Sequence, residues 1–144
     1  MRGTQEAYDD FARQLDYFGR KVVPQQHLHF QREIVCRFFF LVAYQNMEMI
    51  MHPRDTGWAQ RNWRVSVHAP QNNVLGEKTD TPMPRPRTQG DIRSQMSHIK
   101  PFQRVWVYNN VPYMGHLEDG HSGAAPVGIV APALHQLEYE YPMI

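Results

Sequence analysis

The sequence predicts a single α+β domain in which long N-terminal helices pack on a small, mostly antiparallel sheet, with a C-terminal helix and a long proline-rich loop. Three observations support this class. Residues 6–51 carry apolar side chains at helical spacing, two later segments alternate between apolar and polar residues, and the end of the chain returns to a helical pattern. The 144 residues suit one domain built around one core.

A short amphipathic helix is predicted from Glu6 to Lys21. Its apolar side recurs at spacings of four and three residues, at Phe11, Leu15 and Phe18. Glycine and proline interrupt helices, so we expect Gly19 and Pro24 to end this one.

A longer core helix is predicted from Gln25 to Met51. The residues expected to share its buried face are Leu28, Val35, Phe39, Val42 and Met49. The opposite stripe carries Glu33, Arg37, Tyr44 and Glu48. Glu33 and Arg37 are four residues apart, which predicts an ion pair along the helix. His52-Pro53 closes the helix, because the residue before proline is pushed out of the helical region.

Two strands are predicted. Residues 62–68 alternate, with Trp63, Val65 and Val67 on one side and polar residues, among them Arg64, on the other; residues 104–108 form the second strand. The segment between Pro70 and Gly90 has no periodicity, and its prolines at 82–86 favour an extended conformation. We expect 70–90 to form a protruding loop or arm.

Three further helices complete the prediction. The first runs from Asp91 to Lys100, with Ile92, Met96 and Ile99 on its apolar side. A brief helix from Pro112 to Glu118 is expected to stop at Gly120 in the left-handed conformation. The last helix spans 131–141.

Bulk properties exclude several function classes. A formal charge of +1 gives no whole-molecule field for nucleic acid or an anionic membrane, so any DNA contact must be local. The longest apolar block, 38–44, is far shorter than the roughly 20 residues of a membrane span. The chain has one cysteine, Cys36, which lies two residues before this block and is expected to be a buried hydrophobic residue.

The order of short motifs resembles small tail-completion, neck and head-tail connector proteins of tailed bacteriophages, the group that includes the lambda minor tail protein Z type. The motifs are Pro53-Arg-Asp-Thr-Gly57, Asn62-Trp63, Asn110-Val-Pro-Tyr113, Glu118-Asp-Gly120 and Ala131-Pro-Ala-Leu134. The segment from Pro70 to Gly90 does not map on the family's pattern. The resemblance implies a structural virion protein, not an enzyme, that needs no cofactor and forms a ring, commonly a hexamer, at the capsid-tail junction or the tail end.

The implied partners are other copies of the chain, the tail tube protein and a head-closure or connector protein, with no membrane. Edge strands of a two-stranded ribbon also favour pairing between subunits. Residues expected at subunit or partner interfaces are Asp55, Thr56, Gly57, Trp58, Tyr113, Glu118, Gly120, Tyr139 and Tyr141. Residues that could face passing DNA are Arg85, Arg87, Arg93, Lys100 and Arg104.

Each assignment has a structural alternative. Asp55 and Thr56 suit a turn, Glu118 suits a backbone cap, and the aromatic residues suit the subunit's own core. Two other functions stay open: a small metal-dependent hydrolase or nuclease that uses His116, Glu118 and His121, and a nucleic-acid-binding accessory protein. His27 and His29 do not form a metal pair on a helix, because residues two apart face different ways.

Overall fold

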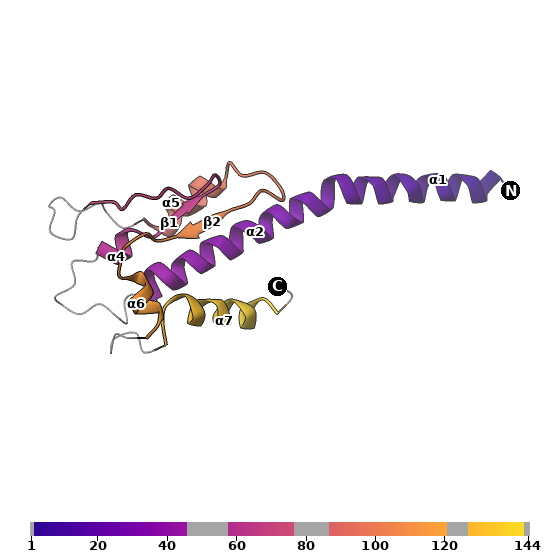
Figure 1. Cartoon of the computed structure of the whole chain (residues 1–144). Helices are drawn as coiled ribbons and strands as arrows, with labels where there is room; N and C mark the ends of the chain where they lie inside the picture. The colour runs from indigo at the N-terminus through magenta and orange to yellow at the C-terminus, as the bar shows by residue number, and fades with distance from the viewer. Residues whose placement is uncertain (1, 46–57, 77–86, 121–126, 143–144) are drawn as a thin grey trace.

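The computed structural model describes residues 2–45, 58–76, 87–120 and 127–142. This part of the chain is mostly helical and contains one two-stranded antiparallel sheet, which confirms the predicted α+β class (Figure 1). Predictions for 46–57, for the prolines at 82–86 and for His121 lie outside the described residues.

The N-terminal half is one continuous helical run. It comprises α1 (Arg2–Tyr17), the π-helical turn η1 (Phe18–Val22), α2 (Val23–Phe40) and a second π-helical turn, η2 (Leu41–Gln45). The predicted end at Gly19 and Pro24 is therefore wrong. In η1 the backbone N–H of Val23 bonds to the carbonyl of Phe18, five residues back, and Pro24 falls at the start of α2. A proline is tolerated in the first turn of a helix, so the π-helical turn lets the chain continue.

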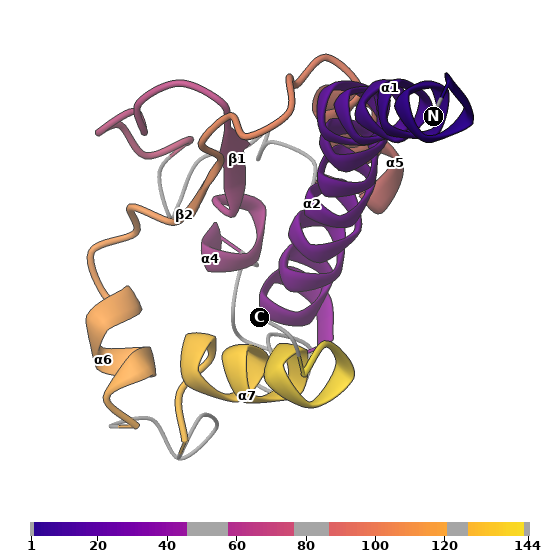
Figure 2. The ribbon, with the colours of Figure 1, turned by 90° about the vertical axis from the view of Figure 1, so that its right-hand side faces the viewer.

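The core forms around α2 and η2. Helix α5 (Gln89–Met96) and helix α7 (Val130–Glu140) both pack on α2, and α7 also meets η2, as does the short helix α4 (Trp58–Arg61). Figure 2 shows α5 and α7 on different sides of α2. The side chains with no more than 1% exposure in this core are those of Phe39, Leu41, Val42, Ala43, Ile92, Met96, Ile129 and Ala133. The predicted burial of Ile92, Met96 and Ile99 is confirmed, although α5 starts at Gln89 and ends at Met96 instead of spanning 91–100, so Ile99 lies beyond it; the burial of Cys36 is confirmed as well.

The sheet is shorter than predicted. Strand β1 (Arg64–Ser66) pairs with β2 (Trp106–Tyr108), with Val65 opposite Val107. Arg64 was expected on the polar, outward side, but it is buried. Its guanidinium donates to the side chain and the carbonyl of Asn73 and lies 4.9 Å from the ring centre of Tyr108. Residues 71–76 thus fold back over the strand, a non-local contact that alternation along the strand does not reveal.

The ion pair predicted between Glu33 and Arg37 is also wrong. Arg37 binds Glu140 of α7 through two hydrogen bonds of 2.6 and 2.8 Å, and Glu33 lies 3.5 Å from Arg93 of α5. Both side chains of α2 therefore link it to the helices packed beside it. Glu33 and Arg37 pair with residues of neighbouring helices and not with each other, because α5 and α7 place Arg93 and Glu140 beside them on α2.

Two helix ends are set by residues close to them in the sequence. Thr88 and Asp91 form a capping box at the start of α5, a signal absent from the sequence predictions. Helix α6 (Met114–Glu118) is followed by Gly120 with φ of 72°, as predicted. None of the described helices has the length and apolar character that crossing a membrane requires.

Candidate functional site

The N-terminal helix α1 carries a series of exposed large apolar side chains. It extends away from the rest of the described chain, and its packing is with η1, its own continuation (Figure 1). Five large side chains of α1 and the start of η1 are more than half exposed; four of them recur at helical spacing, Tyr8 at 72%, Phe11 at 62%, Leu15 at 58% and Phe18 at 53%, and the fifth is Tyr17. Contiguous apolar surface of this kind marks interaction sites in soluble proteins. We call this feature the apolar stripe.

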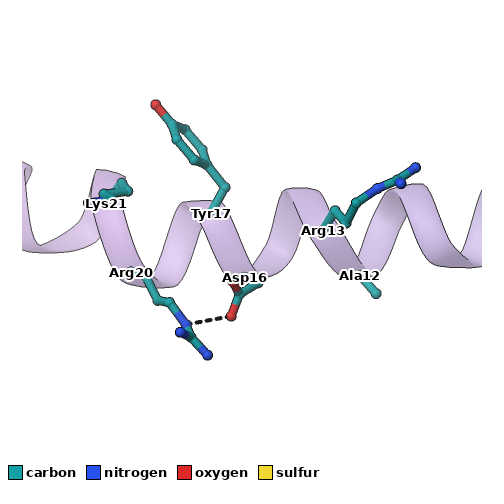
Figure 3. Close-up of a pocket in the computed structure, with 6 residues that line it drawn as sticks. All are labelled: Ala12, Arg13, Asp16, Tyr17, Arg20 and Lys21. Atoms are coloured by element: carbon teal, nitrogen blue, oxygen red, sulfur yellow. Dashed lines mark ion pairs between the residues drawn. The ribbon is translucent and has the colours of Figure 1, made fainter.

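The charged residues of α1 largely satisfy one another. Asp10 pairs with Arg13 at 3.5 Å, and Asp16 pairs with Arg20 of η1 at 2.7 Å. Figure 3 shows the Asp16–Arg20 pair running along the helix, with Tyr17 pointing away from it. Exposed pairs of this type contribute little to stability. They do leave α1 with a polar surface that needs no outside partner.

Sequence reasoning found the apolar side of this helix but did not place it among the interface residues. The sequence feature that revealed this side is the spacing of Phe11, Leu15 and Phe18, and Tyr8, three residues before Phe11, continues the same pattern towards the N-terminus. A periodic face is equally typical of a helix that packs on its own core. Only the three-dimensional arrangement shows that α1 has no such cover within the described residues.

Two predicted interface residues, Trp58 and Tyr113, meet each other inside the subunit. Their ring centres are 5.8 Å apart, and the Trp58 Nε1 donates to the carbonyl of Leu75 at 3.0 Å. Buried Asn62 supports the same place: its amide group donates to the carbonyls of Trp58 and Leu75 and accepts from the Leu75 N–H. Both aromatic side chains are half-buried. Their described contacts connect α4, the 71–76 segment and the approach to α6.

Glu118 joins α6 to the start of α7 through hydrogen bonds to the backbone. Its two oxygens accept from the backbone N–H groups of Ile129, Val130 and Ala131 at 2.7–2.9 Å, at the start of α7. Burial alone would raise the pKa of Glu118, but the three backbone hydrogen bonds hold it below its ordinary value. A carboxylate at a helix N-terminus also interacts favourably with the helix dipole.

Gly128 completes the junction between Glu118 and α7. It is buried and has φ of 82°, and a Cβ at this position would lie 2.6 Å from the carbonyl oxygen of Glu118. The close approach of α6 to the start of α7 therefore requires glycine. Among the options weighed for Glu118 in the sequence, the structure provides the backbone cap.

The remaining predicted interface residues are spread out. Tyr139 is strongly exposed on α7, whereas Tyr141 is half-buried and packs edge-on against Phe30 of α2, with ring centres 5.7 Å apart. Gly120 ends α6. Asp55, Thr56 and Gly57 lie outside the described residues.

The predicted DNA-facing residues do not gather into one patch in the described structure. Arg93 approaches Glu33, Arg104 lies 5.6 Å from the ring centre of Trp106, and Lys100 is exposed. Arg87 instead lines a small polar pocket with Arg64, Gln95 and Tyr108. Arg85 falls outside the described residues.

The described residues do not form the metal site that the histidine-based hydrolase hypothesis requires. Within them, no three His, Cys, Asp or Glu side chains are grouped so that they could hold a metal ion. Glu118 is engaged by backbone amides, and His27 packs on Phe102, with ring centres 4.2 Å apart. His121 belongs to the part of the chain that the structure does not describe.

Comparisons with protein-family models, with curated proteins and with solved structures gave no match for this chain.

Proposed function

We propose that this chain is a structural virion protein that self-associates into a ring at the capsid-tail junction or the tail end of a tailed bacteriophage. The observation that carries the proposal is the apolar stripe on α1, which leaves the isolated subunit with a large surface suited to association. Subunits joined head to tail form a ring when the rotation between them closes. The tail tube protein and a head-closure or connector protein are the proposed partners, with non-specific contact to passing DNA.

The motifs that carry the resemblance support a structural role. Asn62, Tyr113 and Glu118 belong to separate motifs along the sequence, and each makes contacts that link segments of this fold. Their side chains are used to connect α4, the 71–76 segment, α6 and α7. A protein that works by its shape needs such connections and no reacting group.

The test is the mass of the purified chain in solution, measured by light scattering over a range of concentrations, together with negative-stain imaging. We expect oligomers and annular particles. The double variant Phe11→Lys/Leu15→Lys should shift the protein towards monomer, because charges placed in an apolar interface must be desolvated. Glu6→Lys places the same charge on the opposite side of α1 and is the matched control; it should leave the mass unchanged.

A wild-type chain that stays monomeric at every concentration, alone and with a tail tube protein, would contradict the proposal. A monomer that binds a metal ion and loses a hydrolytic activity on His121→Ala would support the hydrolase alternative instead.

A further inference from the structure

We propose that α1 packs side by side, and in the same direction, against α1 of a neighbouring copy of this chain through the apolar stripe. This inference rests on the proposed ring: if α1 lies along the ring axis, rotation about that axis carries every α1 in the same direction, with its stripe against the helices on either side of it. It goes further by naming the partner of the stripe, its direction and its register.

The spacing of the stripe is that of a coiled coil. Tyr8, Phe11, Leu15 and Phe18 are separated by three, four and three residues, so Tyr8 and Leu15 take one core position of a seven-residue repeat and Phe11 and Phe18 take the other. Side chains at these two positions form the seam between supercoiled helices. All four are more than half exposed in the single chain, so they are available for such a seam.

The positions beside the stripe allow close approach of identical helices. They hold small or uncharged residues and one lysine: Gln5, Ala7, Ala12, Gln14, Gly19 and Lys21. In a parallel pair these flanking positions face each other across the seam. Ala7 would lie opposite Ala12 of the neighbour, and Gln14 opposite Gly19, so no two like charges meet there.

The charged residues lie away from the seam. Asp10, Arg13, Asp16 and Arg20 occupy the outer positions of the repeat and form ion pairs within their own helix. Aligning two copies in parallel therefore places no carboxylate in the seam. The helix has an apolar side that lacks a partner and a charged side that does not need one.

The stripe continues beyond α1 as far as the body. Along η1 and the start of α2 it borders a shallow, mostly apolar hollow whose lining residues are Phe18, Val22, Val23, Gln26, His27 and Phe30. Residues on both sides of the junction line it, with Phe18 and Val22 in η1 and Val23 at the start of α2. A neighbouring helix aligned with α1 could thus remain in contact up to the point where α2 enters the core.

The described body of the subunit offers no equally continuous surface for the stripe. Its most exposed apolar residues are Phe102, Val127 and Tyr139, and they lie on three separate segments: the loop before β2, the approach to α7, and α7 itself. The surface that matches the stripe in length and spacing is the same stripe on another copy. This comparison selects α1 of a neighbour over a site on the neighbour's body.

Cysteine cross-linking tests the contact directly. Leu15→Cys places a thiol in the seam, and Arg13→Cys places one on the opposite side of the same helix as the matched control. Cys36 is retained because its side chain is only 4% exposed, and the unmodified chain shows any background. Under mild oxidation, with light scattering as a parallel measure of mass, we expect most of the Leu15→Cys protein to become disulfide-linked dimer and the Arg13→Cys protein to stay uncross-linked.

Two results overturn the inference and are told apart by the mass measurement. If the variants still form rings but Leu15→Cys cross-links no better than Arg13→Cys, then α1 contacts something other than the neighbour's α1, and the proposed ring stands. If the unmodified chain is a strict monomer, the proposed function fails and this contact fails with it.

Discussion

The two halves of the N-terminal helical run have similar patterns and opposite surroundings. Along α2 the apolar residues Cys36 and Phe39 are covered by the rest of the fold, whereas along α1 the residues Phe11 and Leu15 face solvent. Both halves show apolar side chains at helical spacing. The comparison teaches that periodicity predicts an apolar face on a helix but does not tell whether the same chain supplies its cover.

The difference also separates two sources of helix stability. Isolated helices of about 12–15 residues are marginal in water, and most helices in proteins depend on packing. Helix α2 has that packing from α5 and α7. Helix α1 instead continues the same helical run towards the N-terminus, since it ends at Tyr17 where η1 begins, and the proposed contact with a second copy would supply the missing packing.

The largest effect expected from this comparison comes from shortening one phenylalanine in each half. Phe39→Ala removes a side chain that is buried in the core, and it should lower the free energy of unfolding by about 3–5 kcal/mol. Phe11→Ala should change it by less than about 0.5 kcal/mol, since an exposed side chain leaves no cavity. Chemical denaturation at a concentration where both proteins are monomeric measures the two values. Equal losses would show that α1 is packed within its own subunit.

Sequence alone predicted those parts of the fold that depend on local pattern. The buried positions Ile92 and Met96 and the turn at Gly120 followed from helical spacing and from the conformational freedom of glycine. Non-local contacts were missed. Arg64 is buried because residues 71–76 cover it, and Arg37 leaves its helical neighbour for Glu140, which is 103 residues away along the chain.

In the candidate site, too, local features were predicted from the sequence and non-local contacts were missed. Glu118, at the end of a predicted short helix, was singled out, and a backbone cap was among its expected roles beside a subunit contact, because no catalytic partner for it is visible in the sequence. Its three amide donors, however, lie 11–13 residues further on, so the sequence could not identify them. The exposure of the α1 stripe could not be predicted either, because it depends on where every other element packs.

A second prediction uses two glycines to compare a crowded site with an open one. Gly128→Ala should lower the free energy of unfolding by roughly 3 kcal/mol, because the positive φ is strained for alanine and the new Cβ meets the Glu118 carbonyl. Gly115→Ala is the matched control in α6: its Cβ would meet nothing within 4 Å, and alanine favours the helix, so stability should be unchanged or slightly higher. Thermal unfolding of both variants measures the difference. A harmless Gly128→Ala would contradict the close junction between α6 and α7.

The smallest effect concerns two ion pairs of similar length in the two regions. Arg37–Glu140 links α2 to α7, with 31% and 24% of the two side chains exposed, whereas 78% and 58% are exposed in Arg20–Asp16. The hydrogen bonds from Arg37 and from Gln136 lower the pKa of Glu140 to about 2. A carboxylate with a lowered pKa stabilises the fold at pH values above its unfolded pKa, about 4.3 for glutamate, and this stabilisation is lost as the pH falls through its folded pKa.

Glu140→Gln should therefore be less stable than the unmodified chain at neutral pH, and the difference should shrink as the pH falls from about 4.3 towards about 2. Asp16→Asn, in the exposed pair, should show no measurable difference at any pH, because such pairs contribute little and α1 lies outside the packed core. Denaturation midpoints measured across this pH range check both variants, and a Glu140→Gln difference that is independent of pH would show that the pair acts through packing instead of charge.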